Sequence, residues 1–178
     1  PISGDILSID AGAIYEGFHG DAAFTMGIGE VSPEAQHLID TTEQAMWAGI
    51  RQVKKGNRLG DIGSVIAEVG ATHGYGVVEE YVGHGIGREM HEEPQVPNYG
   101  ESGTGMKLRS GMALCIEPMF NIGRRHTKVD ADGWTVRTQD GSLSAHWEHT
   151  VALTSDGPMV FTAAEDPVPV EEAASTSI

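Results

Sequence analysis

The sequence is organised around residues 83–94, Gly-His-Gly-Ile-Gly-Arg-Glu-Met-His-Glu-Glu-Pro. Its two histidines, His84 and His91, are seven residues apart. Glycines flank His84, and glycine lets a backbone approach an ion or a ligand where a Cβ atom would collide. Neutral imidazole binds metal ions and transfers protons near neutral pH. The segment therefore predicts a functional site, and the alternative is two ordinary histidines in a glycine-rich loop.

The composition limits the class of protein. The 178 residues are 39% hydrophobic and 21% charged, which is typical of a globular domain with a sizeable core. A net charge of −15 argues against direct nucleic-acid binding, because phosphate recognition needs clustered Lys and Arg. No apolar run reaches the roughly 18 residues that a membrane span needs. Cys115 is the single cysteine, so we expect a buried, unpaired thiol in a reducing, cytoplasmic compartment.

Residues 5–26 are typical of a β-hairpin with a turn at Tyr15-Glu16-Gly17. If the loop consists of residues 15 and 16, Asp10 lies directly opposite Asp21 on the same face of the hairpin. Like charges in directly opposed positions are destabilising. A cation between the two carboxylates would reverse that effect, so the hairpin predicts a cation site.

Two helices are predicted after the hairpin. For the first helix, Ser32 is a good N-cap and Pro33 suits the first turn. Its apolar residues recur with a helical period, and the helix is expected to end at the positively charged segment 54–56. The second helix is expected from about residue 59 to residue 73, where Gly74 ends it.

The rest of the chain favours strands, at residues 77–82, 112–119 and 144–154, with a polar hairpin before the last. Glu117 interrupts an apolar strand, where a carboxylate costs free energy unless it is paired or bound to metal. In the last strand, alternation places Glu148 on the same face as His146. We expect one domain over residues 1–163 and an acidic, disordered tail over residues 164–178.

Separate strands thus deliver four carboxylates and one imidazole. These residues are Asp10, Asp21, His84, Glu117 and Glu148. Carboxylates suit hard divalent cations, and an imidazole favours Mn, Fe, Co or Zn. The charge of four carboxylates balances the charge of two such ions. A water that bridges ions about 3.5–4 Å apart loses a proton near neutral pH. The pattern predicts a two-metal hydrolase, although each acid taken singly could be a strand-end residue or an ion-pair partner.

Four blocks of the sequence resemble the bacterial type I methionine aminopeptidases of metallopeptidase family M24. The blocks are residues 9–10 with 17–21, residues 83–87 with 91–96, residues 116–118, and residues 142–145 with 148–150. The likeness covers about residues 5–160. It implies an α+β pita-bread (creatinase/aminopeptidase-like) fold, in which helices cover a curved antiparallel sheet and residues 1–163 form the catalytic domain.

The resemblance also implies the role of each candidate residue. Two divalent ions (Co, Mn, Fe or Zn) would be bound by Asp10, Asp21, His84, Glu117 and Glu148, with Asp21 and Glu148 bridging them. Glu117 would also act as the general base or proton shuttle. His91 would bind the substrate carbonyl oxygen and stabilise the tetrahedral intermediate. Met90 and Trp134 would lie near the pocket for the substrate methionine, since apolar side chains suit a thioether.

The activity implied is removal of the N-terminal methionine from nascent peptides near the ribosome by a cytoplasmic, monomeric enzyme. Family members carry an N-terminal part before the position of Pro1, with a further catalytic histidine and part of the methionine pocket. That part is missing here, so we expect activity from a longer parent rather than from this chain alone. The alternatives are a proline-specific peptidase of the same fold and an inactive peptide-binding relative.

Overall fold

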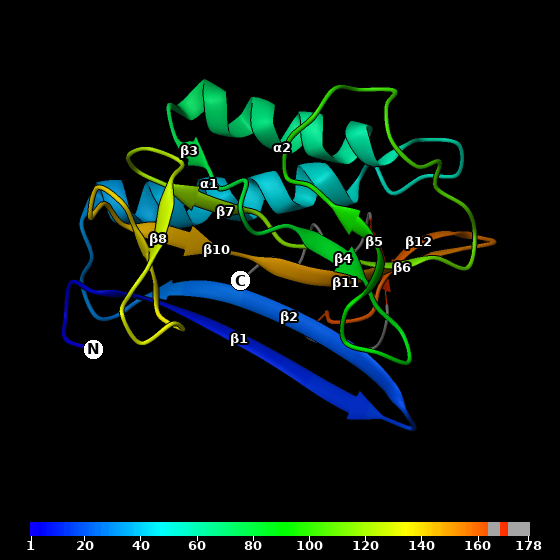
Figure 1. Ribbon diagram of the computed structural model, residues 1–178, viewed down its shortest axis with the longest axis horizontal. Helices are drawn as coiled ribbons and strands as arrows, with labels where there is room; N and C mark the ends of the chain where they lie inside the picture. The colour runs from blue at the N-terminus through cyan, green and yellow to red at the C-terminus, as the bar shows by residue number, and fades with distance from the viewer. Residues whose placement is uncertain (164–167, 171–178) are drawn as a thin grey trace.

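The largest element is a curved, eight-stranded antiparallel sheet (Figure 1). The computed structural model describes residues 1–163 and 168–170. The strands of this sheet are β1 (Ile6–Tyr15), β2 (Phe18–Gly27), β4 (Gly83–Gly85), β5 (Glu92–Val96), β6 (Ala113–Ile116), β11 (Glu148–Thr154), β12 (Gly157–Val160) and β13 (Val168–Pro169). Their order is β1-β2-β11-β6-β4-β5, with β12 paired to β11 and β13 paired to β12.

Two smaller sheets complete the β structure. One has the order β10-β7-β3, and the other is the hairpin of β8 and β9. Their strands are β3 (Gly76–Val77), β7 (Met119–Asn121), β8 (Thr127–Val129), β9 (Val136–Thr138) and β10 (Ser144–His146). The predicted polar hairpin is confirmed as β8–β9. The predicted strand at residues 77–82 is wrong beyond Val77, because the chain runs on to β4 without strand pairing.

Helices α1 (Pro33–Ile50) and α2 (Leu59–His73) lie side by side over one face of the sheets (Figure 1). Ser32 caps α1, because its Oγ accepts a hydrogen bond from the backbone N–H of Ala35 at 3.1 Å. Gly74 ends α2 in the left-handed conformation, with φ of 73°. The predicted end of α1 at residues 54–56 is wrong: the helix stops at Ile50, and the following turn buries Val53 completely.

The hydrophobic core lies between the two helices and the strands. Its fully buried side chains include Leu38, Met46 and Ile50 of α1 and Ile62 and Ile66 of α2. Burial of each such side chain contributes about 1.5–3 kcal/mol, which fixes the helices on the sheet. Within the described residues, neither helix is long and apolar enough to cross a membrane.

The β1–β2 hairpin differs from its predicted register by two residues. The loop consists of Glu16 and Gly17, both with positive φ, as tight hairpin turns require. Asp10 therefore lies opposite Ala23, and the predicted direct opposition to Asp21 is wrong. Because side chains alternate with a period of two, a shift of two residues leaves both aspartates on the same face.

The strands predicted at residues 112–119 and 144–154 are each broken in the middle. β6 and β11 belong to the large sheet, whereas β7 and β10 belong to a small one. Pro118 has no N–H to continue a strand ladder, and its carbonyl oxygen accepts a hydrogen bond from the Trp147 N–H at 3.3 Å. The two chain segments thus change sheets together, beside Glu117 and Glu148.

Most of the predicted tail, residues 164–167 and 171–178, lies outside the described residues. Within the part of the tail that the structure covers, Val168–Pro169 form β13 beside β12, and Val170 is buried in the core. The backbone of residues 168–169 therefore extends the large sheet.

Candidate metal centre

A cavity of about 740 Å³ gathers nearly all of the predicted site residues. It lies where the β1–β2 hairpin and the β4–β5 segment meet the two junctions between the sheets, β6–β7 and β10–β11. Seven predicted residues line it: Asp10, Asp21, His84, His91, Glu117, Trp134 and Glu148. Side chains far apart in the sequence are therefore brought to one place by the sheet topology.

His84 is oriented by its own strand. Its Nδ1 lies 2.9 Å from the Gly85 carbonyl oxygen, which can only accept, so Nδ1 carries the proton and Nε2 is free to bind a cation. Nε2 lies 3.4 Å from Glu117 Oε1 and 4.0 Å from Asp21 Oδ2. This hydrogen-bonded imidazole is the arrangement that metal-binding histidines adopt.

The glycines around His84 allow close backbone approach. A Cβ atom on Gly83 would overlap the Cys115 carbonyl oxygen of β6, and one on Gly85 would overlap the Glu93 carbonyl oxygen of β5. Glycine at these two positions lets β4 lie between its neighbours. The packing of β4 in turn fixes the position of His84 in the cavity.

Three carboxylates of the centre are buried, and burial together with neighbouring acids raises the pKa of each. Burial, and then the charge of Glu148, raises the pKa of Glu117 to about 9. Burial, and then the charge of Asp21, raises the pKa of Glu148 to about 8. Burial and Asp10 raise the pKa of Asp21 as well. Without cations these carboxylates resist ionisation, and bound divalent ions would reverse that preference.

The donor set of the cavity fits divalent metal ions. Asp21, His84, Cys115 and Glu148 each offer a ligand atom within 4.8 Å of the others. Glu148 is 2% exposed, and its Oε1 has no hydrogen-bond partner among the described residues. Such an atom is costly unless a cation or a proton satisfies it. Carboxylates with one imidazole suit Mn, Fe, Co or Zn.

Cys115 is a member of this group of potential ligands. The predicted burial of its side chain is confirmed, since Cys115 is 0% exposed. Burial, and then the charge of Glu148, strongly raises the pKa of the thiol, and a thiol must lose its proton to bind metal. Its Sγ lies 3.6 Å from Thr150 Oγ1. The carboxylates and the imidazole are therefore the better donors.

The three residues assigned to the substrate lie in different places. His91 is exposed in the cavity, with its ring centroid 4.4 Å from that of His84. Trp134 is 87% exposed in the turn between β8 and β9, so it lines the cavity without being buried. Met90 does not line the cavity: its side chain packs against the backbone of β1 at Gly12, where a Cβ atom would collide with it.

The cavity also contains eight residues to which the sequence assigned no individual role, including three from the predicted segment 83–94. They are Tyr81, Val82, Gly83, Glu92, Glu93, Gln95, Met119 and His146. His146 is the most chemically informative, because its Nε2 is buried without a partner among the described residues. Burial lowers its pKa, which favours neutral imidazole. In the sequence, the alternation of residues 144–154 places His146 on the same face as Glu148. That shared face was the signal that could have identified His146 as a site residue.

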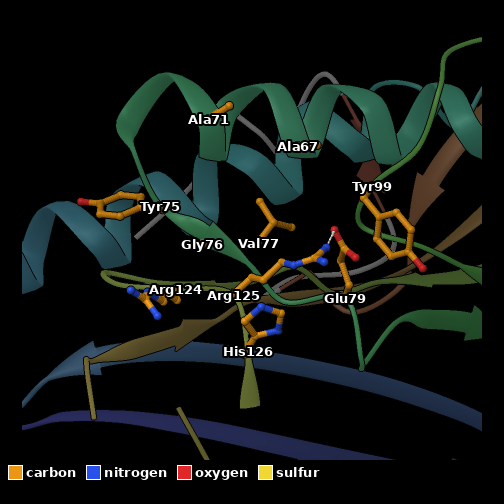
Figure 2. A pocket seen from close by; sticks show the side chains of 10 residues that line it. All are labelled: Ala67, Ala71, Tyr75, Gly76, Val77, Glu79, Tyr99, Arg124, Arg125 and His126. Atoms are coloured by element: carbon orange, nitrogen blue, oxygen red, sulfur yellow. Dashed lines mark ion pairs between the residues drawn. The ribbon is translucent and has the colours of Figure 1, made fainter. Parts of the chain in front are cut away.

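A second cavity, of about 430 Å³, lies under α2 (Figure 2). Ala67 and Ala71 of α2 form one wall, and Arg125 reaches across to form an ion pair with Glu79. None of the predicted site residues lines it. Its Arg125–Glu79 ion pair lies at the surface, whereas the first cavity gathers the buried carboxylates of Asp21, Glu117 and Glu148. The metal-binding chemistry therefore lies in the first cavity.

Comparisons with known proteins agree with this geometry. A family model described as metallopeptidase family M24 matches residues 2–155. A methionine aminopeptidase of Clostridium acetobutylicum is 53% identical over 162 residues, which cover 91% of this chain and 65% of that protein. The crystal structure of a Thermotoga maritima methionine aminopeptidase matches with a TM-score of 0.87 and 47% identity, covering 90% of this chain and 64% of that one.

A more distant match is the prolidase of Pyrococcus horikoshii, with a TM-score of 0.70 and 26% identity, covering 92% of this chain and 41% of that one. This chain spans slightly less than two thirds of the length of the two methionine aminopeptidases above. The higher identity and TM-score favour the methionine aminopeptidases over the prolidase as relatives.

Proposed function

Because the chain belongs to metallopeptidase family M24, we propose that the protein is a metal-dependent aminopeptidase that removes the N-terminal methionine of newly made proteins. The buried cluster of carboxylates around His84 is the observation that carries this proposal. The 53% identity to a methionine aminopeptidase supports methionine as the residue removed. Since the chain spans less than two thirds of that relative, the proposal concerns the activity of the whole protein.

Two divalent ions would be held by the acidic cluster and its imidazole. The proposed ligands are Asp10, Asp21, His84, Glu117 and Glu148. When bound, such ions supply Lewis acidity, which lowers the pKa of water enough to provide a nucleophile near neutral pH. Co, Mn, Fe and Zn all suit this donor set. The unpartnered Oε1 of Glu148, and the His84 imidazole with its Nε2 directed at Glu117 and Asp21, support the assignment.

Glu117 is the proposed general base. Its carboxylate lies beside His84 in the cavity, where burial and neighbouring acids raise its pKa. With divalent ions bound, Glu117 would be ionised, so its carboxylate could accept a proton from water and pass it to the leaving amine. Asn98 Nδ2 donates a hydrogen bond to the Glu117 carbonyl oxygen at 3.2 Å, which supports the position of the residue.

His91 is proposed to bind the substrate rather than a metal ion. It is exposed in the cavity next to His84, so a peptide carbonyl group can approach its ring. A hydrogen bond from the imidazole to that oxygen would stabilise the charge that develops during attack. Trp134 and Met119 line the same cavity, and their apolar side chains suit the methionine thioether.

The proposed substrate is the N-terminal methionine of nascent peptides at the ribosome, and the proposed enzyme is a cytoplasmic monomer. The net charge of −15 supports contact with the peptide rather than with ribosomal RNA. The single free cysteine suits a reducing compartment.

Peptide cleavage tests this proposal. The protein, expressed at the full length of its gene, is loaded with Mn²⁺ or Co²⁺ and given Met-Ala-Ser and an X-Pro peptide in parallel. We expect metal-dependent release of methionine with a much higher kcat/KM for Met-Ala-Ser. Faster cleavage of the X-Pro peptide would assign the protein to the proline-specific branch instead. Binding of either peptide without cleavage under both metals would indicate an inactive peptide-binding relative.

A further inference from the structure

His146 faces the metal cavity from β10, on the side of Asp10 and Glu148. Asp10, His146 and Glu148 each offer one ligand atom, and these atoms lie within 4.8 Å of one another. His146 Nε2 is 4.0 Å from Glu148 Oε2, which is too long for a direct hydrogen bond. The three side chains are thus close together but lack a direct contact, as ligands of a shared ion would be.

The backbone of His146 is held by a hydroxyl group of the hairpin. Thr25 Oγ1 accepts a hydrogen bond from the His146 N–H at 2.9 Å and donates one to the His146 carbonyl oxygen at 2.7 Å. Ser8 Oγ lies 2.8 Å from Thr25 Oγ1, where it can donate to the second lone pair of that oxygen. β10 is therefore fixed against β1 and β2. A ligand held by such supporting contacts needs little reorganisation to bind an ion.

Two buried atoms on this side of the cavity lack partners. His146 Nε2 and Glu148 Oε1 are both inaccessible to solvent and make no hydrogen bond with any described residue. The Glu148 side chain is only 2% exposed. Buried polar atoms without partners are rare in folded proteins. One cation between Asp10, His146 and Glu148 would satisfy His146 Nε2 and bind the Glu148 carboxylate.

We propose that His146 is a metal ligand, and that it forms, with Asp10 and Glu148, a second imidazole-containing half of the centre. The first half contains His84, Asp21 and Glu117. This inference rests on the metal centre of the proposed function and extends it, because the resemblance and the proposed ligand set supply a single imidazole. A nitrogen donor in each half favours Mn, Fe, Co or Zn over Mg or Ca in both halves.

Cobalt titration tests the proposal on the protein at the full length of its gene. Isothermal calorimetry and the visible absorption of bound Co²⁺ are compared for the wild type, His146→Gln, His84→Gln and His37→Gln. We expect two ions to bind the wild type. His146→Gln weakens one of them at least about tenfold, and His84→Gln weakens the other. His37 is exposed on α1, so His37→Gln leaves both binding events unchanged.

Nitrogen-15 NMR of the histidine rings in the wild type provides a readout that does not depend on folding of a variant. With Zn²⁺ in place of Co²⁺, we expect the His146 Nε2 resonance to shift on metal addition to the position of a metal-bound imidazole. Two bound ions with no change at His146, and equal affinity in His146→Gln, would overturn this inference and leave the proposed function intact. Absence of any tight metal binding would overturn both.

Discussion

Glu117 and Glu148 lie opposite one another across the line where the chain changes from the large sheet to a small one. The pairs Ile116–His149 and Met119–His146 share one antiparallel register, and that register places the two glutamates face to face. Directly opposed like charges destabilise a sheet. Both side chains are buried, and each has a raised pKa. We interpret this costly pairing as the framework of the metal centre.

Replacement of Glu117 tests its proposed role as proton carrier. Glu117→Gln keeps the size of the side chain but removes the group that accepts the proton, so we expect kcat for Met-Ala-Ser to fall by at least about 10²–10⁴-fold. Steady-state kinetics under saturating Mn²⁺ measure the effect. Glu68→Gln, on the exposed face of α2, is the matched control and keeps full activity. Near-normal turnover by Glu117→Gln would remove Glu117 from the mechanism.

The stability of the metal-free protein should fall as the pH rises. The folded protein holds a proton on Glu117 up to a pKa of about 9, whereas the unfolded chain releases it near the ordinary value of 4.5. This contribution is fully present below the unfolded pKa and is lost as the pH rises through about 9. Glu148, with a pKa of about 8, acts in the same direction.

Urea unfolding after EDTA treatment, at about pH 5.5 and about pH 8.5, measures this dependence. We expect the lower free energy of unfolding at the higher pH. Glu117→Gln reduces the difference because the amide does not titrate. Saturating Mn²⁺ stabilises the protein most at the higher pH, where the carboxylates are free to bind it. A free energy that is constant or higher at the higher pH in metal-free wild type would contradict the electrostatic account of the centre.

His91 and the metal ligands should respond differently to mutation. Because His91 is proposed to contact the substrate oxygen and no ion, His91→Ala should lower kcat by about 10²–10³-fold and leave the affinity for metal unchanged. Peptide-cleavage rates and Co²⁺ calorimetry on the same preparation separate the two effects. Loss of a bound ion in His91→Ala would show that this histidine is a ligand, contrary to our assignment.

The packing of β4 makes Gly83 a sensitive position. Gly83→Ala introduces a Cβ atom that overlaps the Cys115 carbonyl oxygen, and we expect it to destabilise the fold by about 1–3 kcal/mol. Gly20→Ala is the control, since its nearest neighbour would be Thr162 Cγ2 at 4.0 Å. Chemical denaturation of both variants measures the difference. Equal stability would mean that β4 moves away from β6 without cost, and that glycine is not required there.

Much of the site followed from the sequence because strand alternation is a local property. Asp10 and Asp21 stay on one face of the hairpin even though the register differs by two residues. The break at Pro118 had a local signal, because proline has no N–H for a strand ladder. The break at Trp147 depends on which distant strand pairs with each segment, and alternation within one strand carries no information about its partners.

The same distinction explains why His146 was not among the predicted site residues. Its spacing from Glu148 indicated a shared face. The burial of its Nε2 without a partner among the described residues, and its proximity to Asp10, depend on contacts between distant strands. The position of Met90 was equally hard to predict, because its side chain packs against Gly12 of a strand that is distant in the sequence. Contacts between segments far apart in the sequence decide both cases.

The crystal structure of the Mn²⁺-loaded protein, with anomalous diffraction recorded at the manganese absorption edge, tests the metal centre most directly. We predict two anomalous peaks in the cavity. They should lie among the side chains of Asp10, Asp21, His84, Glu117 and Glu148. A well-ordered cavity without a peak at saturating Mn²⁺, or peaks bound only elsewhere on the acidic surface, would contradict the account.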